Sequence, residues 1–124
     1  MGLDMFFIKV PHGENPGDAD FDKSTLIKYF RKHSDLHGWL NEQWLKTQPD
    51  GSNPDDFNCK YFLITQEVLD GVKSLCAKSR KKKYKGLFWG ASCKEDWDET
   101  KELCNVIQDC LDSVFTDVYY YSWW

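Results

Sequence analysis

The sequence predicts one domain of the α+β class, with α/β as the alternative: a sheet of about four strands packed against about three helices. Short apolar and aromatic segments typical of strands alternate with segments whose apolar residues recur every three or four positions, as in helices. Such alternation favours a sheet layered against helices. The 124 residues suit one core and are too few for two, so we expect a single domain over residues 1–124. The strand order is not encoded in this pattern.

The N-terminal segment predicts a strand followed by a loop. Residues 3–10 combine apolar side chains with Asp4 and Lys9 and end at Pro11, which cannot donate to a sheet ladder. Residues 12–22 contain glycine, proline and four acidic residues, a composition typical of an exposed loop.

The segment from residue 26 to residue 45 keeps a helical stripe after Ser24, a candidate capping residue. Ser34, Asp35 and Gly38 weaken the middle of this segment. Two alternatives stay open, either two helices or an extended segment followed by a helix. The stripe consists of Leu26, Tyr29, Phe30, His33, Leu36, His37, Leu40 and Trp44.

The centre of the chain predicts a loop, a strand and a helix in succession. Residues 48–58 hold two prolines, one glycine and three aspartates, which indicates a loop. Residues 60–65 carry four consecutive apolar residues and predict a strand. Thr65 then caps a helix that runs to about Lys78. Its expected buried face consists of Val68, Leu69, Val72, Leu75 and Cys76.

The stretch after the basic loop Lys78–Lys85 predicts a buried strand over residues 87–89, a glycine turn and the best-patterned helix of the chain. Ser92 followed by Glu95 fits a capping box at the start of that helix. Residues 118–121 predict a last strand. The helix stripe consists of Trp97, Thr100, Leu103, Cys104, Ile107, Cys110, Leu111 and Val114.

The charge balance argues against binding to nucleic acid or to an anionic membrane. Sixteen basic residues stand against 20 acidic ones, a net charge of −4. Six of the basic residues lie within Lys78–Lys85, which indicates a solvated connector, with nucleic-acid binding as the alternative. No signal peptide or apolar stretch of roughly 18–20 residues is readable, and the five cysteines include no C-x-x-C pair. We therefore expect a reduced, cytoplasmic protein without membrane attachment.

No cofactor or metal is expected, because no glycine-rich dinucleotide motif or phosphate loop occurs. His33 and His37 have the four-residue spacing of paired metal ligands, but no third ligand accompanies them, so a structural pair is favoured. The turn Gly90–Asp96 offers helix N–H groups for a small anion, and Ser92 and Cys93 as nucleophiles. No base is assignable to that turn from the sequence.

The aromatic carboxyl end is the strongest candidate contact surface. Residues 119–124 contain three tyrosines and two tryptophans, and period-two alternation exposes one face of their strand. We expect an edge strand here. The alternative is a terminal strand that simply packs on the sheet, and a homodimer through this edge would satisfy both possibilities.

Five blocks of the sequence carry a family resemblance: Met1–Phe6, Tyr29–Lys32, Leu36–Leu40, Phe88–Ser92 and the Tyr-Ser-Trp ending. Together they resemble a family of short uncharacterised proteins scattered through bacterial and phage genomes, which open with Met-Gly-Leu-Asp-Met and an aromatic residue. The resemblance covers most of the chain and implies a small accessory protein of mobile-element or phage origin. It implies no activity.

The sequence thus predicts a small non-enzymatic binding protein, such as a phage-type modulator of a host protein. A protein partner is expected. The alternatives are a binding protein or enzyme for a phosphorylated or nucleotide-like ligand at the Gly90–Asp96 turn, and nucleic-acid binding through Lys78–Lys85. The residues expected to converge in one binding site are Arg31, His37, Trp39, Trp89, Gly90, Ser92, Tyr120 and Trp123.

Overall fold

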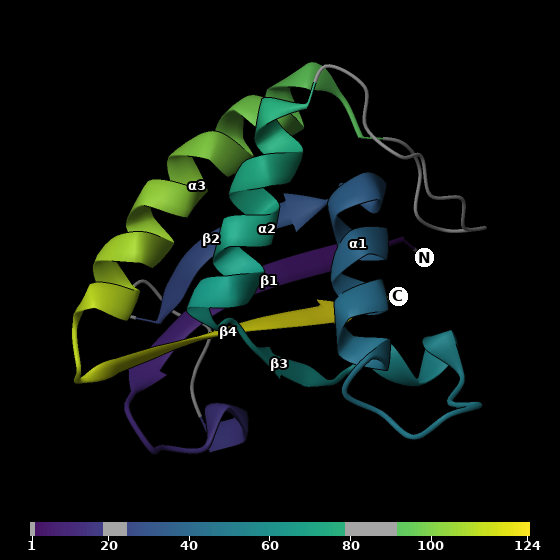
Figure 1. The fold of residues 1–124 in the computed structure, drawn as a ribbon, viewed down its shortest axis with the longest axis horizontal. Coiled ribbons are helices and arrows are strands. Elements are labelled where there is room, and N and C mark those ends of the chain that lie inside the picture. The colour runs from purple at the N-terminus through teal and green to yellow at the C-terminus, as the bar shows by residue number, and fades with distance from the viewer. Residues whose placement is uncertain (1, 19–24, 79–91) are drawn as a thin grey trace.

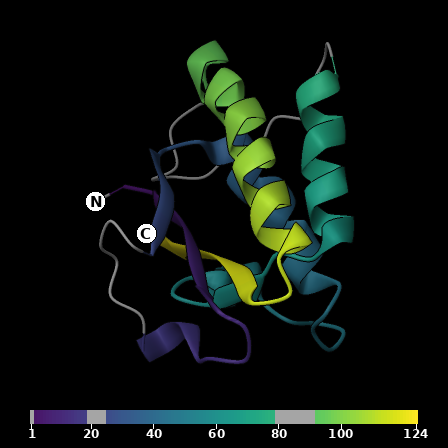
Figure 2. The same cartoon turned by 90° about the vertical axis from the view of Figure 1, so that its left-hand side faces the viewer.

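The computed structural model describes residues 2–18, 25–78 and 92–124, which form a four-stranded antiparallel sheet and three helices (Figure 1). The strands are β1 (Asp4–Pro11), β2 (Leu26–Arg31), β3 (Tyr61–Leu63) and β4 (Thr116–Trp123), and the helices are α1 (Ser34–Leu45), α2 (Gln66–Ala77) and α3 (Lys94–Asp112). The spatial order of the strands is β2-β1-β4-β3. The helices gather on one side of the sheet (Figure 2). The expected α+β class is confirmed.

The segment from residue 26 to residue 45 is a strand followed by a helix, as the second of the two alternatives proposed. Antiparallel pairing with β1 sets Met5 opposite Phe30 and Phe6 opposite Tyr29. Phe30 is buried and Tyr29 is exposed, so the period-two pattern of a strand prevails over the helical stripe. The described chain therefore begins with two consecutive strands, and the simple alternation of strands and helices is wrong there. The strand expected at residues 87–89 lies outside the described residues.

The C-terminal strand β4 is an interior strand, so the expected edge position is wrong. Over Tyr119–Tyr121 it pairs with β1 on one side and with β3 on the other. Both hydrogen-bonding edges are occupied over these residues, so a second copy cannot add to them as a strand. The predicted alternation is confirmed, because Val118, Tyr120 and Ser122 are fully buried.

The two long helices begin close to where the sequence predicts. Thr65 caps α2, accepting the Val68 N–H at 3.3 Å, as expected. The cap of α3 is Cys93 instead of Ser92, and the Asp96 carboxylate accepts the Cys93 N–H at 2.9 Å. The capping box is thus shifted by one residue, because the Ser92 hydroxyl is bound elsewhere.

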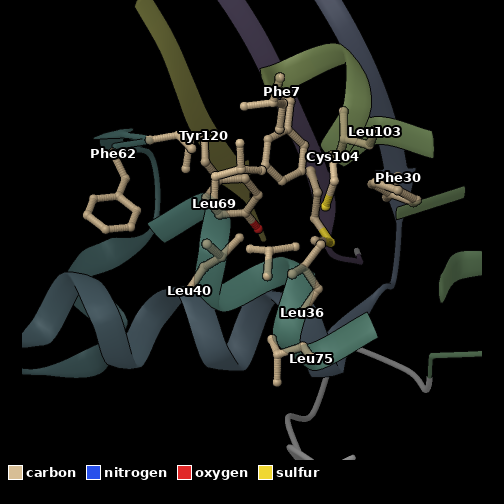
Figure 3. Packing of buried hydrophobic residues seen from close by; sticks show 14 of the residues in the cluster. Phe7, Phe30, Leu36, Leu40, Phe62, Leu69, Leu75, Leu103, Cys104 and Tyr120 are labelled. Carbon is tan, nitrogen blue, oxygen red and sulfur yellow. The ribbon is translucent and has the colours of Figure 1, made fainter. Parts of the chain in front are cut away.

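The hydrophobic core lies between the helices and the face of the sheet turned towards them (Figure 3). Most of the predicted stripes of α2 and α3 are buried there, whereas Val114 is 77% exposed, since α3 ends at Asp112. No helix in the described ranges is long and apolar enough to cross a membrane. The core residues labelled in Figure 3 are Phe7, Phe30, Leu36, Leu40, Phe62, Leu69, Leu75, Leu103, Cys104 and Tyr120.

Candidate functional site

The face of the sheet opposite the helices carries a line of aromatic rings, one from each strand. Tyr29 of β2 lies beside Phe6 of β1, Phe6 beside Tyr121 of β4, and Tyr121 beside Tyr61 of β3. The ring centroids are 5.2, 6.2 and 4.6 Å apart along this line, and the rings are tilted against one another. We call these four residues the aromatic row. Ring pairs at such distances stabilise each other beyond the area they bury.

Two further sets of side chains flank the aromatic row on this face. On one side, Asp4 lies between Arg31 and Trp123 in the sheet register. On the other side, Tyr119 pairs with Leu63. Together with the aromatic row, these five residues define what we call the outer face. Large apolar side chains on it are accessible, with 42% exposure at Tyr29, 42% at Leu63 and 60% at Trp123.

The accessible part of this face is limited to one half of β1. Ile8 and Val10 share the register positions of Tyr119 and Asp117, yet they are buried, with exposed fractions of 0% and 3%. They do not belong to the core cluster on the helix side. On β1, the outer face is therefore accessible only around Asp4 and Phe6.

The phenol groups on the outer face are held in their neutral form. The Tyr29 hydroxyl donates to the Asp4 carboxylate, and this hydrogen bond raises the pKa of Tyr29. A hydrogen bond with the Cys59 thiol, followed by burial, raises the pKa of Tyr121 to about 12. The rings can thus act as apolar surface with a hydrogen-bonding tip.

A small cavity of about 230 Å³ opens at one corner of the outer face, lined by Gly2, Asp4, Trp123 and Trp124. A Cβ atom placed on Gly2 would come within 3.2 Å of Lys32 Cε and 3.6 Å of Arg31 Nη2. Two cationic side chains therefore lie close to Gly2, one of the residues that line the cavity.

His37 and Tyr120 lie together on the helix side and not on the outer face. His37 Nδ1 is 2.7 Å from the Tyr120 hydroxyl, and the histidine ring packs against Phe57 and Trp124. Burial lowers the pKa of His37 to about 3. Both residues have 0% exposure, so neither offers surface to a partner.

A chain of hydrogen bonds joins the start of α1 to the start of α3 through Ser92. The Asp35 N–H donates to Ser92 Oγ at 2.9 Å, and Ser92 Oγ is 2.7 Å from His33 Nδ1. The Thr100 hydroxyl donates to the Asp96 carbonyl at 2.6 Å, so it accepts from His33 Nε2, 2.9 Å away. Because Nε2 carries the ring hydrogen, His33 Nδ1 is unprotonated and accepts the hydrogen of the Ser92 hydroxyl. Burial lowers the pKa of His33 to about 4.

The Ser92–His33 contact supplies the base that sequence reasoning did not assign. A serine hydroxyl within hydrogen-bond reach of an oriented histidine is the arrangement that activates a nucleophile. The same contacts also cap the N-terminus of α1, since His33 itself makes no side-chain cap. The two residues are 59 positions apart, and no local signal connects them.

The remaining predicted residues lie at separate places. Trp39 on α1 faces α2, where a Cβ on Gly71 would come within 2.4 Å of its ring, and it lines a cleft of about 590 Å³. Arg31 and Trp123 are on the outer face. Trp89 and Gly90 lie outside the described residues. The six described residues therefore do not converge in one site, and of them only His37 and Tyr120 meet. Tyr120 and Trp123 point to opposite faces of β4, and Trp39 packs against α2.

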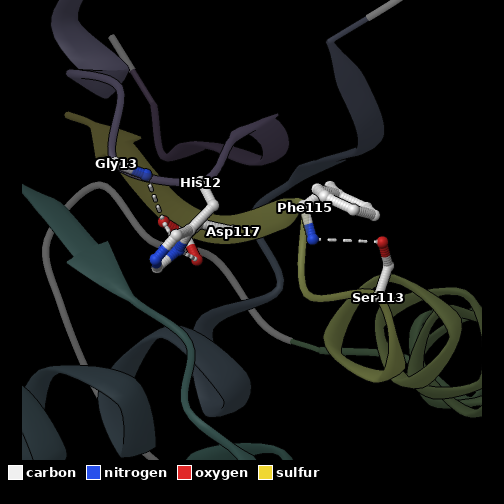
Figure 4. Close-up of polar contacts among 5 residues, drawn as sticks. All are labelled: His12, Gly13, Ser113, Phe115 and Asp117. Atoms are coloured by element: carbon white, nitrogen blue, oxygen red, sulfur yellow. Dashed lines mark hydrogen bonds and ion pairs between the residues drawn. The ribbon is translucent and has the colours of Figure 1, made fainter.

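At the far end of the sheet, an exposed pair closes the junction between β1 and β4 (Figure 4). His12 Nδ1 lies 3.0 Å from the Asp117 carboxylate, which also accepts the Gly13 N–H at 3.2 Å. These bonds lower the pKa of Asp117. Beside the pair, the Phe115 N–H donates to Ser113 Oγ at 3.3 Å. The arrangement reinforces the turn between α3 and β4.

The sequence also raised the possibilities of a metal site and of nucleic-acid binding through the basic segment. No three His, Cys, Asp or Glu side chains in the described ranges are placed to hold a metal. The basic segment is described only at Lys78, and residues 79–85 lie outside the described part. A comparison with protein-family models, with curated proteins and with solved structures found no match to this chain.

Proposed function

We propose that this chain is a small non-enzymatic binding protein that contacts a protein partner through its outer face. The single observation that carries this proposal is the aromatic row, which places a ring from each strand on the side of the sheet opposite the helices. A host protein modulated by an accessory protein of phage or mobile-element type is the partner that the family resemblance implies.

The composition of the outer face supports a protein contact. Tyrosine and tryptophan supply large, rigid contact area with few rotatable bonds, and they dominate the energetic centres of protein interfaces. Tyr29 and Trp123 are substantially exposed, whereas other aromatic residues of the strands, such as Phe7 and Phe30, fill the helix-side core (Figure 3). Rings placed away from that core add little to it. Their exposure is explained by a contact with a second molecule.

Site-specific photo-crosslinking in the native host tests this proposal. A photoreactive phenylalanine derivative replaces Leu63 or Trp123 on the outer face, and Val106 on α3 in the control, which is also exposed, at 46%. We expect one discrete protein adduct from each outer-face position and none from the control. Equal crosslinking at all three positions, or none at Leu63 and Trp123, contradicts the proposal.

The Ser92–His33 contact favours a second candidate function, that of a serine-dependent hydrolase. In such an enzyme Ser92 Oγ attacks an electrophilic centre while its proton passes to His33 Nδ1, and Thr100 holds the imidazole in the required orientation.

A fluorophosphonate probe tests this candidate without a known substrate. With an activated serine, a bond forms from Oγ to phosphorus, fluoride leaves, and the hydroxyl proton is taken up by His33. A mass increase located at Ser92 and absent in Ser92→Ala supports the hydrolase. An unlabelled Ser92 in the folded protein removes this candidate and leaves Ser92 as the cap of α1.

A further inference from the structure

We infer that the partner presents an acidic segment to the outer face: its carboxylates meet Arg31 and Lys32 while a neighbouring apolar side chain enters the cavity between Trp123 and Trp124. This inference rests on the proposed function and names the chemistry of the partner. Four observations carry it.

The first observation is that, among the helices and strands, most of the carboxylates lie on the helices. The three helices carry eleven carboxylates against three lysines, whereas the strands carry Asp4 and Asp117 against Lys9, Lys28 and Arg31. Of these strand cations only Arg31 lies on the outer face, because Lys9 and Lys28 share the register positions of the core residues Val118 and Phe7. The positive charge of the outer face is therefore confined to the corner at Arg31 and its neighbour Lys32. The helix carboxylates are Asp35, Glu42, Glu67, Asp70, Glu95, Asp96, Asp98, Glu99, Glu102, Asp109 and Asp112.

The second observation is a pair of adjacent exposed cations at one corner of the outer face. Arg31 ends β2, and Lys32 follows it with a positive φ of 61°, its N–H donating to the Leu3 carbonyl at 2.8 Å. Neither the His12–Asp117 pair nor the Lys28–Glu99 pair involves these two cations. Asp4, which lies opposite Arg31 in the register, is the carboxylate nearest to them, and it accepts a hydrogen bond from the Tyr29 hydroxyl.

The third observation is the cavity beside these cations. Trp123 and Trp124 line it together with Gly2 and Asp4, and its volume of about 230 Å³ suits one side chain of a partner. Trp124 is fixed by a perpendicular contact with the buried His37 ring, with centroids 4.7 Å apart, and its backbone carbonyl accepts from Asn58 Nδ2. Because this wall is pre-organised, an apolar side chain that enters loses little free energy to ordering of the site.

The fourth observation distinguishes an acidic protein segment from a nucleic acid. A polyanion is bound by cations spread along its track, with bases stacked on the rings between them. The far end of the outer face carries Tyr61, Leu63 and Tyr119, and the nearest strand charge on the same face is Asp117, an acidic residue. Cations at one corner match a few carboxylates beside one anchor residue, and not a continuous phosphate backbone.

Selection of displayed random peptides on the full chain tests this inference. We expect the selected peptides to carry Asp or Glu close to a Phe, Leu or Trp, and their binding to weaken as salt rises. The double variant R31E/K32E should lower their affinity by about tenfold or more. The variant K94E/K101E is the matched control, because it makes the same charge change on α3 and should leave the affinity unchanged.

The outcomes separate this inference from the proposed function. Binding that is lost in L63K/W123A but kept in R31E/K32E overturns the acidic partner and leaves the outer face as the contact surface. Binding that survives in both variants overturns the proposed function as well. Selected peptides without acidic residues, a selection without binders, or displacement of the peptide by a twenty-residue oligothymidine at equal concentration also overturns the acidic partner.

Discussion

Two histidines that the sequence places four positions apart contribute to the fold through separate hydrogen bonds. His33 joins Ser92 to Thr100, and His37 joins the core through Tyr120. Both rings are buried, and burial disfavours their charged form. The spacing that favours a metal pair on an ideal helix has no such role here, because His33 precedes the first residue of α1.

The buried histidines predict a loss of stability in mild acid. In the unfolded chain they take up protons near pH 6.5, whereas in the folded chain they do so only near pH 4 for His33 and pH 3 for His37. The free energy of unfolding is therefore highest above pH 6.5 and falls as the pH drops towards 4, by up to about 3 kcal/mol for His33 alone. Urea unfolding at pH 7, 6 and 5 measures this slope. His12→Gln, at an exposed position, should keep it, and a flat profile between pH 6.5 and 5 contradicts the assignment.

We predict that the single hydroxyl of Ser92 contributes measurably to the free energy of unfolding. Ser92→Ala leaves the Asp35 N–H and His33 Nδ1 without their partner, and we expect a cost of about 1–2 kcal/mol. Ser74→Ala on the exposed side of α2 is the control and should change stability by less than about 0.5 kcal/mol. Equal effects of the two substitutions in urea unfolding would show that Ser92 does not link α1 to α3.

At the scale of elements, the contact between α1 and α2 depends on the absence of a side chain at Gly71. The Trp39 ring occupies the space that a Cβ would take, at 2.4 Å from Cη2 and 2.5 Å from Cζ2. A glycine inside a helix otherwise costs about 1 kcal/mol relative to alanine. Its presence in α2 is explained by this close approach.

Gly71→Ala should therefore destabilise the protein by about 1–3 kcal/mol in spite of its better helix propensity. In a Trp39→Ala background the same substitution should instead stabilise α2, because the space is then open. The free energy of unfolding of the four proteins in this cycle measures the sign change. If Gly71→Ala is stabilising in both backgrounds, the ring does not rest on α2.

The elements also differ in how far local sequence patterns predict them. The cap and buried face of α2 were predictable, because Thr65 and a regular apolar stripe act within one segment. The segment 26–31 was ambiguous, because its residues fit both a helical stripe and a strand, and pairing with β1 decides for the strand. The capping residue of α3 was misplaced by one position, because Ser92 binds Asp35 and His33 in another part of the chain.

At the scale of the whole molecule, the two faces of the sheet differ in what they stabilise. Phe7 packs in the core against Phe30 and Tyr120, whereas Leu63 and Trp123 lie exposed on the outer face. Phe7→Ala should cost about 3–5 kcal/mol of folding free energy. The single substitutions Leu63→Lys and Trp123→Ala should each cost less than about 1 kcal/mol.

Chemical unfolding of these three variants measures the difference between the faces. The core variant Phe7→Ala serves as the positive control. If Trp123→Ala proves as damaging as Phe7→Ala, the outer face is part of the folding core, and its exposure no longer argues for a partner.

The sequence by itself determined the fold class, the two long helices and the alternation within the last strand, since these follow from periods of 3.6 and 2 acting over neighbouring residues. Tertiary structure alone decided the strand order, the interior place of β4 and the partner of Ser92. It also decided the aromatic row, whose members come from four separate strands. The physical reason is the same for each of these features: they are made by hydrogen-bonded or packed residues that are distant in the chain, and no local period records which distant segments pair.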